Sequence, residues 1–153
     1  MKDMTIVVGS DHAGFEMKEQ VCQYLQSQDV TVEDMGCNST DSCDYPDFAL
    51  AVGEKIRSGA CQLGILICGS GVGMAIAVNK VPGIRAANVF DPEIAGLARE
   101  HNNANVLTLG SRFLTLEKAQ EIVEKFLTTE FAGNRHAKRV DKISAIEERY
   151  CGK

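Results

Sequence analysis

The sequence predicts a single doubly wound α/β domain over residues 1–153. Short β-branched runs alternate with longer amphipathic segments, and the connections between the runs can hold helices. Most of the runs are nearly continuous in apolar residues, as strands buried on both faces are. The length of 153 residues is that of one domain. We therefore expect a Rossmann-like, three-layer αβα sandwich with a five-stranded parallel sheet in flavodoxin-like order.

The strand candidates are short and rich in β-branched residues. They read TIVV, TVED, LGILIC, RAANVF and NVLTLG, and four of them are almost entirely apolar. In chain order they are Thr5–Val8, Thr31–Asp34, Leu63–Cys68, Arg85–Phe90 and Asn105–Gly110.

The segments between and after the strands carry helix signals. The first places apolar residues such as Phe15 and Leu25 near one face. Proline and glycine mark the ends of the others: Pro46 precedes the second helix, Gly59 follows it, and Pro92 opens the fourth. The helix candidates are Gly14–Gln28, Asp47–Ser58, Gly73–Lys80, Pro92–Glu100, Thr115–Leu127 and Arg135–Arg149.

A polar, irregular stretch separates the second strand from the second helix. Gly36–Tyr45 reads GCNSTDSCDY and predicts a long loop. A plain surface connection and a segment that faces a substrate are equally consistent with this composition.

The composition excludes several classes of protein. Hydrophobic residues make up 44% and charged residues 24%, which excludes a disordered chain, a collagen-like repeat and a disulfide knot. The formal charge of −5 argues against broad nucleic-acid binding, although a local basic patch could bind a small anion. No apolar run approaches the ~18–20 residues that span a bilayer, and the N-terminus lacks a signal-peptide pattern. We expect a cytoplasmic protein with no nucleic-acid or membrane partner.

The cysteine pattern agrees with a reducing compartment. Six cysteines stand at positions 22, 37, 43, 61, 68 and 151, with no C-x-x-C pair and no cluster spaced like metal ligands. We expect neither a zinc site nor a thioredoxin-like motif. Five of the cysteines are interpreted as small apolar fillers, and Cys68 is the exception.

The most informative stretch is the glycine-rich turn after the third strand. Gly69, Gly71 and Gly73 leave backbone N–H groups uncrowded next to a helix start, an arrangement that can bind an anion. The spacing is not G-x-G-x-x-G, so a dinucleotide site is disfavoured, and no G-K-[ST] follows as in a P-loop. Met74 stands where the phosphate loop of low-molecular-weight phosphatases needs arginine.

Cys68 enters this turn from the strand. At a helix N-terminus, facing free amides, a thiolate is favoured over a thiol. Cys68 could therefore act as a base or nucleophile beside an oxyanion site. A buried cysteine that simply ends a core strand is an equally good interpretation of the spacing alone.

The histidines and arginines suggest further polar groups. His12 follows Asp11 after the first strand, and His101 precedes Asn102 before the last, so we expect both pairs at the ligand edge, outside the carboxyl ends of the strands. Surface or satisfied core histidines are the alternative. Around His136, Arg135 and Arg139 are four residues apart and would form a two-guanidinium clamp for phosphate, or else a solvated basic helix start.

Taken together, the motifs closely resemble the type B ribose-5-phosphate isomerases, a family that includes allose- and galactose-6-phosphate isomerases. The resemblance covers essentially the whole chain in order, and seven motifs carry it. They are G-S-D-H-A-G-F (Gly9–Phe15), D-Y-P (Asp44–Pro46), I-C-G-S-G-V-G-M (Ile67–Met74), N-K-V-P-G-I-R-A (Asn79–Ala86), H-N-N-A-N-V-L (His101–Leu107), G-S-R (Gly110–Arg112) and R-H-x-x-R-V (Arg135–Val140).

The resemblance implies a reaction and a set of roles. Ribose 5-phosphate and ribulose 5-phosphate would interconvert through an enediolate, without metal or other cofactor. Cys68 resembles the base, Ser70 a hydrogen-bonding partner of the C1 and C2 oxygens, and His101 the group that opens the sugar ring, assisted by Asp11. The residues resembling other substrate contacts are Tyr45, Asn102, the oxyanion-binding amides of Gly69, Gly71, Val72 and Gly73, and, at the phosphate end, His12, Arg112, Arg135, His136 and Arg139.

The resemblance also implies an assembly. Members form homodimers, often paired further into tetramers, with active sites shared between subunits, and the helix over 135–149 is expected to contribute to the dimer interface. Some relatives carry glutamate in the glycine loop instead of the cysteine, and others G-T-G where this chain has G-S-G. An isomerase for a six-carbon sugar phosphate and a non-catalytic phosphate-binding module are the alternatives that the sequence leaves open.

Overall fold

The structure, a computed structural model, describes residues 4–151 as an α/β domain built on a parallel sheet. The pairings confirm the predicted five-stranded parallel sheet. The strands are β1 (Thr5–Ser10), β2 (Thr31–Asp34), β3 (Leu63–Cys68), β4 (Ala86–Asn88) and β5 (Val106–Gly110).

The predicted flavodoxin-like strand order is wrong. The order is β2-β1-β3-β5-β4, so the last two strands exchange places relative to that prediction. Strand β5 is buried along its whole length and pairs with β3 on one side and β4 on the other. Strand β4 keeps only three residues of the predicted Arg85–Phe90, all half-buried, which suits an edge position. Burial thus places the longer, more apolar strand inside.

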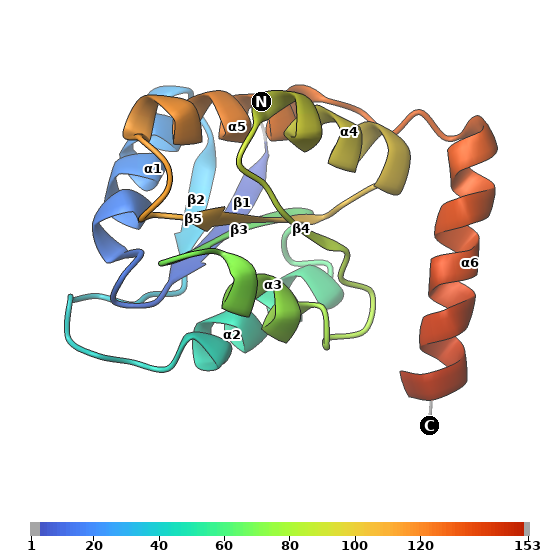
Figure 1. The fold of residues 1–153 in the computed structure, drawn as a ribbon, viewed down its shortest axis with the longest axis horizontal. Coiled ribbons are helices and arrows are strands. Elements are labelled where there is room, and N and C mark those ends of the chain that lie inside the picture. The colour runs from blue at the N-terminus through green and yellow to red at the C-terminus, as the bar shows by residue number, and fades with distance from the viewer. Residues whose placement is uncertain (1–3, 152–153) are drawn as a thin grey trace.

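Residues 4–151 contain six helices, of which the first five form the two outer layers (Figure 1). The six are α1 (Phe15–Ser27), α2 (Tyr45–Arg57), α3 (Val72–Val78), α4 (Pro92–Asn102), α5 (Leu116–Thr128) and α6 (Asn134–Cys151). Figure 1 shows α1, α4 and α5 on one face of the sheet and α2 and α3 on the other, and each face has its own hydrophobic core.

The side on which each helix lies follows from strand order. The connections β1–β2 and β4–β5 step toward the β2 edge, whereas β2–β3 and β3–β4 step toward the β4 edge. Parallel crossovers are right-handed, so opposite steps place helices on opposite faces. This rule accounts for α1 and α4 on one face and for α2 and α3 on the other.

Helix α2 starts two residues earlier than predicted. Asp44 is its N-cap in an extended conformation, and Pro46 lies within the first turn, where a missing N–H costs nothing. Tyr45 is therefore the first helical residue, and the predicted loop over 36–45 ends at Asp44.

Helix α6 covers neither face of the sheet. It lies beside α4 and stands apart from the rest of the domain (Figure 1). Glu147 accepts hydrogen bonds of 2.9 Å from the N–H of Gly83, which joins α6 to the turn before β4. Apolar side chains of α6 remain exposed, at 61% for Ile146 and 73% for Tyr150.

No helix within residues 4–151 is both long and apolar enough to cross a membrane.

Candidate active site

The glycine-rich turn lies between the end of β3 and the start of α3. Gly71 adopts a left-handed conformation with φ of 78°, and its N–H donates to Sγ of Cys68 at 3.1 Å. Among residues 4–151, the N–H groups of Gly69, Ser70 and Gly73 have no protein acceptor. The Cys68 side chain is only 5% exposed, but its sulfur is directed at this turn. The structure thus joins a thiol to a set of free backbone donors.

Two polar residues that the sequence analysis missed support the turn. Asn88 of β4 donates from Nδ2 to the carbonyl of Ser70 at 3.4 Å, and its Oδ1 accepts from the buried hydroxyl of Thr108 at 3.1 Å. A polar residue within each of two otherwise apolar strands was the available signal, since buried polar groups need a partner. Asn88 and Thr108 hold the turn against the sheet.

Gly71 is a position where any side chain should be costly. A Cβ there would lie 2.2 Å from Oδ1 of Asn88 and 3.0 Å from the backbone carbon of Leu109. Gly59 has nearly the same φ, 77°, with open space around it, and so provides a control for backbone strain alone. We expect Gly59→Ala to lower the free energy of unfolding by about 1–2 kcal/mol and Gly71→Ala by about 1–3 kcal/mol more. Urea denaturation measures both, and equal losses would contradict the predicted clash.

Arg112 and Tyr45 flank the glycine turn. A Cβ on Gly69 would meet the guanidinium carbon of Arg112 at 3.0 Å, and one on Gly73 would meet the Tyr45 ring at 2.8 Å. Both side chains therefore lie directly on the turn, and both are exposed to solvent. A cation and a phenol hydroxyl are available to a ligand bound there.

Asp11 and His12 lie at the neighbouring end of β1. The N–H of Asp11 donates to the carbonyl of Ile67 at 3.2 Å, one residue before Cys68. The buried carboxylate of Asp11 accepts from the N–H of Gly14 at 3.0 Å. Nδ1 of His12 accepts from the N–H of Cys43 at 3.2 Å, so its Nε2 carries the proton. The structure confirms that these two residues lie at the carboxyl ends of the strands, the edge that also holds Cys68.

The remaining predicted residues form a second group where α4 ends and α6 begins. The rings of His101 and His136 stack with centroids 4.1 Å apart and planes 10° apart. Burial lowers the pKa of His136, and the nearby His101, Arg135 and Arg139 lower it further. Both arginines are exposed, as is Asn102. This second group offers imidazole and guanidinium donors to an anion.

The prediction that His101 and Asn102 lie at the same edge as Cys68 is wrong. Cys68 is opposite Gly110 at the end of β5, whereas the carbonyl of Asn102 accepts from Nε of Arg85, just before β4 begins. Strand β5 spans on the order of 13 Å between these ends, since a parallel strand rises about 3.3 Å per residue. A helix returns antiparallel to the strands it connects, so the residues that end α4 lie at the amino ends of the strands.

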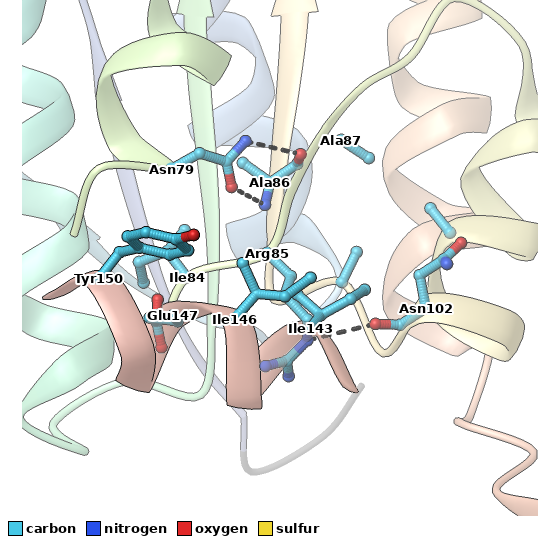
Figure 2. A pocket seen from close by; sticks show the side chains of 12 residues that line it. Asn79, Ile84, Arg85, Ala86, Ala87, Asn102, Ile143, Ile146, Glu147 and Tyr150 are labelled. Atoms are coloured by element: carbon cyan, nitrogen blue, oxygen red, sulfur yellow. Dashed lines mark hydrogen bonds between the residues drawn. The ribbon is translucent and has the colours of Figure 1, made fainter. Parts of the chain in front are cut away.

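A separate cavity of about 520 Å³ lies between α6 and the domain. Figure 2 shows Ile143, Ile146 and Tyr150 of α6 on one side, with Ile84, Arg85 and Asn102 among the residues around it. The lining is largely apolar and does not include Cys68. Among residues 4–151, no group of three or more His, Cys, Asp or Glu side chains could hold a metal ion.

Comparison with known proteins gives consistent matches along the chain. The model of a family described as ribose/galactose isomerase matches residues 6–143. Ribose-5-phosphate isomerase B of Escherichia coli is 44% identical over 144 residues, which are 94% of this chain and 97% of the relative. A probable ribose-5-phosphate isomerase B of Mycoplasma pneumoniae is 47% identical over 143 residues, covering 93% and 94%.

Solved structures agree with these sequence matches. Ribose-5-phosphate isomerase B of Clostridium thermocellum has a TM-score of 0.95 and 48% identity, covering 96% of this chain and 99% of that one. The enzyme of Mycoplasma genitalium, solved with bound ribulose 5-phosphate, has a TM-score of 0.92 and 44% identity, covering 97% and 99%.

Proposed function

This chain belongs to the ribose/galactose isomerase family, and on that premise we propose that it interconverts D-ribose 5-phosphate and D-ribulose 5-phosphate. The observation that carries the proposal is the contact between Cys68 Sγ and the N–H of Gly71, inside a turn with further free amides. Aldose–ketose isomerisation moves one proton between adjacent carbons while an oxygen gains negative charge. A base beside fixed N–H donors supplies both requirements, and no redox cofactor takes part.

The proposed roles at the turn follow from this geometry. Cys68 removes the proton from C2 of the open-chain aldose and returns it to C1, so a single thiol serves both halves of the reaction. The amides of Gly69 and Gly73 stabilise the developing enediolate, joined by those of Gly71 and Val72, which turn to the substrate oxygen from Cys68 Sγ and Ser70 Oγ. Ser70 hydrogen bonds to the C1 and C2 oxygens, its Oγ already accepting from the N–H of Val72 at 3.3 Å. Tyr45, whose ring lies against Gly73, contacts the sugar.

The proposed roles of the other residues concern ring opening and phosphate binding. His101 exchanges the proton that opens the furanose ring, with Asp11 assisting and Asn102 contacting the sugar. The phosphate is bound by imidazole and guanidinium groups. These are His12, Arg112, Arg135, His136 and Arg139.

The placement of these groups supports a homodimer. Cys68 and His101 lie at opposite ends of the sheet in one chain, so one substrate cannot contact both. A two-fold dimer brings the Cys68 end of one copy to the His101 end of the other and creates two complete sites. The exposed apolar side of α6, within the expected interface segment 135–149, and the apolar cavity beside it support an interface there. We propose that residues 1–153 act as one domain in such a dimer, which can pair into a tetramer.

The proposed location of the reaction is the cytoplasm. A reducing compartment keeps thiols free, as they are at Cys22, Cys37, Cys43, Cys61 and Cys68.

An assay in heavy water tests the reaction. The purified protein should convert ribose 5-phosphate to ribulose 5-phosphate and place solvent deuterium at C1 of the product, because the thiol exchanges its proton during the enediolate's lifetime. Six-carbon sugar phosphates assayed in parallel measure the preference for chain length. Absence of both conversion and exchange with all of these substrates would overturn the proposed function.

Arg135 and Arg139 should act mainly on binding. Both are exposed and follow one face at the start of α6, where they would hold the phosphate equally in substrate and transition state. We expect alanine at either position to raise KM by about 10-fold or more, the value of one charge-assisted hydrogen bond, with a smaller change in kcat. Lys142→Ala, on the same helix, is the matched control for loss of a surface cation. An unchanged KM in both arginine variants would place the phosphate elsewhere.

A further inference from the structure

Two cysteines of the loop between β2 and α2 are held against the end of β1. The N–H of Cys37 donates to the carbonyl of Ser10 at 2.9 Å, and its Sγ lies 3.8 Å from Oγ of Ser10. The N–H of Cys43 donates to Nδ1 of His12, and its Sγ lies 3.9 Å from the same nitrogen. Six positions apart in sequence, the two thiols are thus anchored to the same short segment, Ser10–His12.

The two thiols, both held at Ser10–His12, lie close enough for one to affect the ionisation of the other. Burial raises the pKa of Cys43, and the adjacent Cys37 thiol raises it further. Cys37 is buried at 7% exposure, whereas Cys43 is only partly covered, so a small oxidant reaches Cys43 first. The polar loop between them lies on the surface, and its Asp41 and neighbouring residues are exposed. A short, exposed connection lets the sulfurs approach without moving the sheet.

Two other cysteines lack this arrangement. Cys22 lies on the buried face of α1, and burial raises its pKa to about 11. Cys61 donates to the carboxylate of Glu33 at 3.3 Å, and burial together with that carboxylate raises its pKa to about 11. Within residues 4–151, no second thiol is among the groups that shift the pKa of either one. The loop cysteines differ in that each has the other beside it.

We propose that Cys37 and Cys43 form a reversible intramolecular disulfide when the protein meets a peroxide. The thiolate of Cys43 attacks one peroxide oxygen and becomes a sulfenic acid, and the other oxygen leaves as water after protonation. The Cys37 sulfur then attacks the sulfenic sulfur, which forms the S–S bond and releases a second water. Two thiols are oxidised, and one hydrogen peroxide is reduced to two waters.

The disulfide should weaken substrate binding through His12. A disulfide bonds two sulfurs at about 2.05 Å, which draws the Cys43 sulfur toward Cys37 and away from the imidazole it now contacts. His12 then loses a neighbour that helps to hold its ring. This consequence rests on the proposed function, because it assumes that His12 binds the phosphate. We expect KM for the sugar phosphate to rise severalfold on oxidation and to recover with dithiothreitol.

Peptide mass spectrometry of the full-length protein tests the disulfide without any substrate. Reduced protein is treated with stoichiometric hydrogen peroxide, alkylated and digested. The expected result is a linked peptide pair joining Cys37 to Cys43, absent in Cys37→Ser and removed by dithiothreitol. Its rate of formation should rise with pH, because the thiolate is the attacking species, and burial, Cys37 and Asp11 raise the pKa of Cys43 more than His12 lowers it. Linkage to another cysteine, or Cys43 oxidised beyond the sulfenic acid while Cys37 stays free, would overturn the proposal.

A kinetic comparison tests the consequence separately. The KM of the oxidised wild type is compared with that of Cys37→Ser after the same treatment. A rise in KM restricted to the wild type supports the role of the disulfide, whereas a loss of kcat in both proteins reports oxidation of Cys68. A mapped disulfide with an unchanged KM would overturn the effect on binding and leave the disulfide itself established.

Discussion

Replacing Cys68 by alanine is expected to lower kcat for ribose 5-phosphate isomerisation by ~10²–10⁴-fold, the range for loss of a general base. The sulfur accepts a hydrogen bond from the N–H of Gly71, within the proposed oxyanion-binding turn. Alanine at this position leaves no base to move the proton. KM should change little, because the thiol contacts the reacting carbons rather than the phosphate. Steady-state kinetics with ribose 5-phosphate measures the effect.

The control for this substitution is another buried cysteine. Cys22→Ala removes a thiol of similar exposure, 8% against 5%, from the buried face of α1. It should lose stability while keeping kcat. Circular dichroism and size-exclusion chromatography should show that Cys68→Ala keeps its fold and assembly. A folded Cys68→Ala with a normal kcat would remove the thiol from the mechanism.

Mixing two inactive variants is expected to restore activity. Cys68→Ala carries an intact His101 end, and His101→Ala carries an intact Cys68 end. If each site combines the two ends from different copies, every mixed dimer contains one fully intact site and one doubly altered site. Random exchange of subunits then gives about a quarter of the wild-type activity.

The outcome of this mixing discriminates sharply between architectures. If one chain contained a complete site, every chain in the mixture would be damaged and no activity would return. The required control mixes Cys68→Ala with the double variant Cys68→Ala/His101→Ala, which contains no intact combination. Subunit exchange is driven by mild denaturation and refolding, and kcat is measured before and after. Recovery in the first mixture alone supports the shared site.

Local sequence patterns were enough to predict most of the helices and strands and the group of site residues around Cys68. Short runs rich in apolar or β-branched residues located all five strands, and the Cys68–Gly73 turn was visible because glycines adjoin a cysteine at a helix start. Asp11 and His12 were correctly placed, since they directly follow a strand and the carboxyl ends of parallel strands meet at one edge. Such predictions depend only on neighbours in sequence.

The tertiary structure decided what depends on distant parts of the chain. The position of β5 between β3 and β4 follows from which strand gains more by being buried on both sides, and no local pattern compares two strands. The support of the turn by Asn88 and Thr108 depends on the same register. The separation of His101 from Cys68 depends on the direction of α4, which returns to the opposite end of the sheet. The sequence by itself specified the chemical groups, whereas the packing of the sheet determined which of them one chain can bring together.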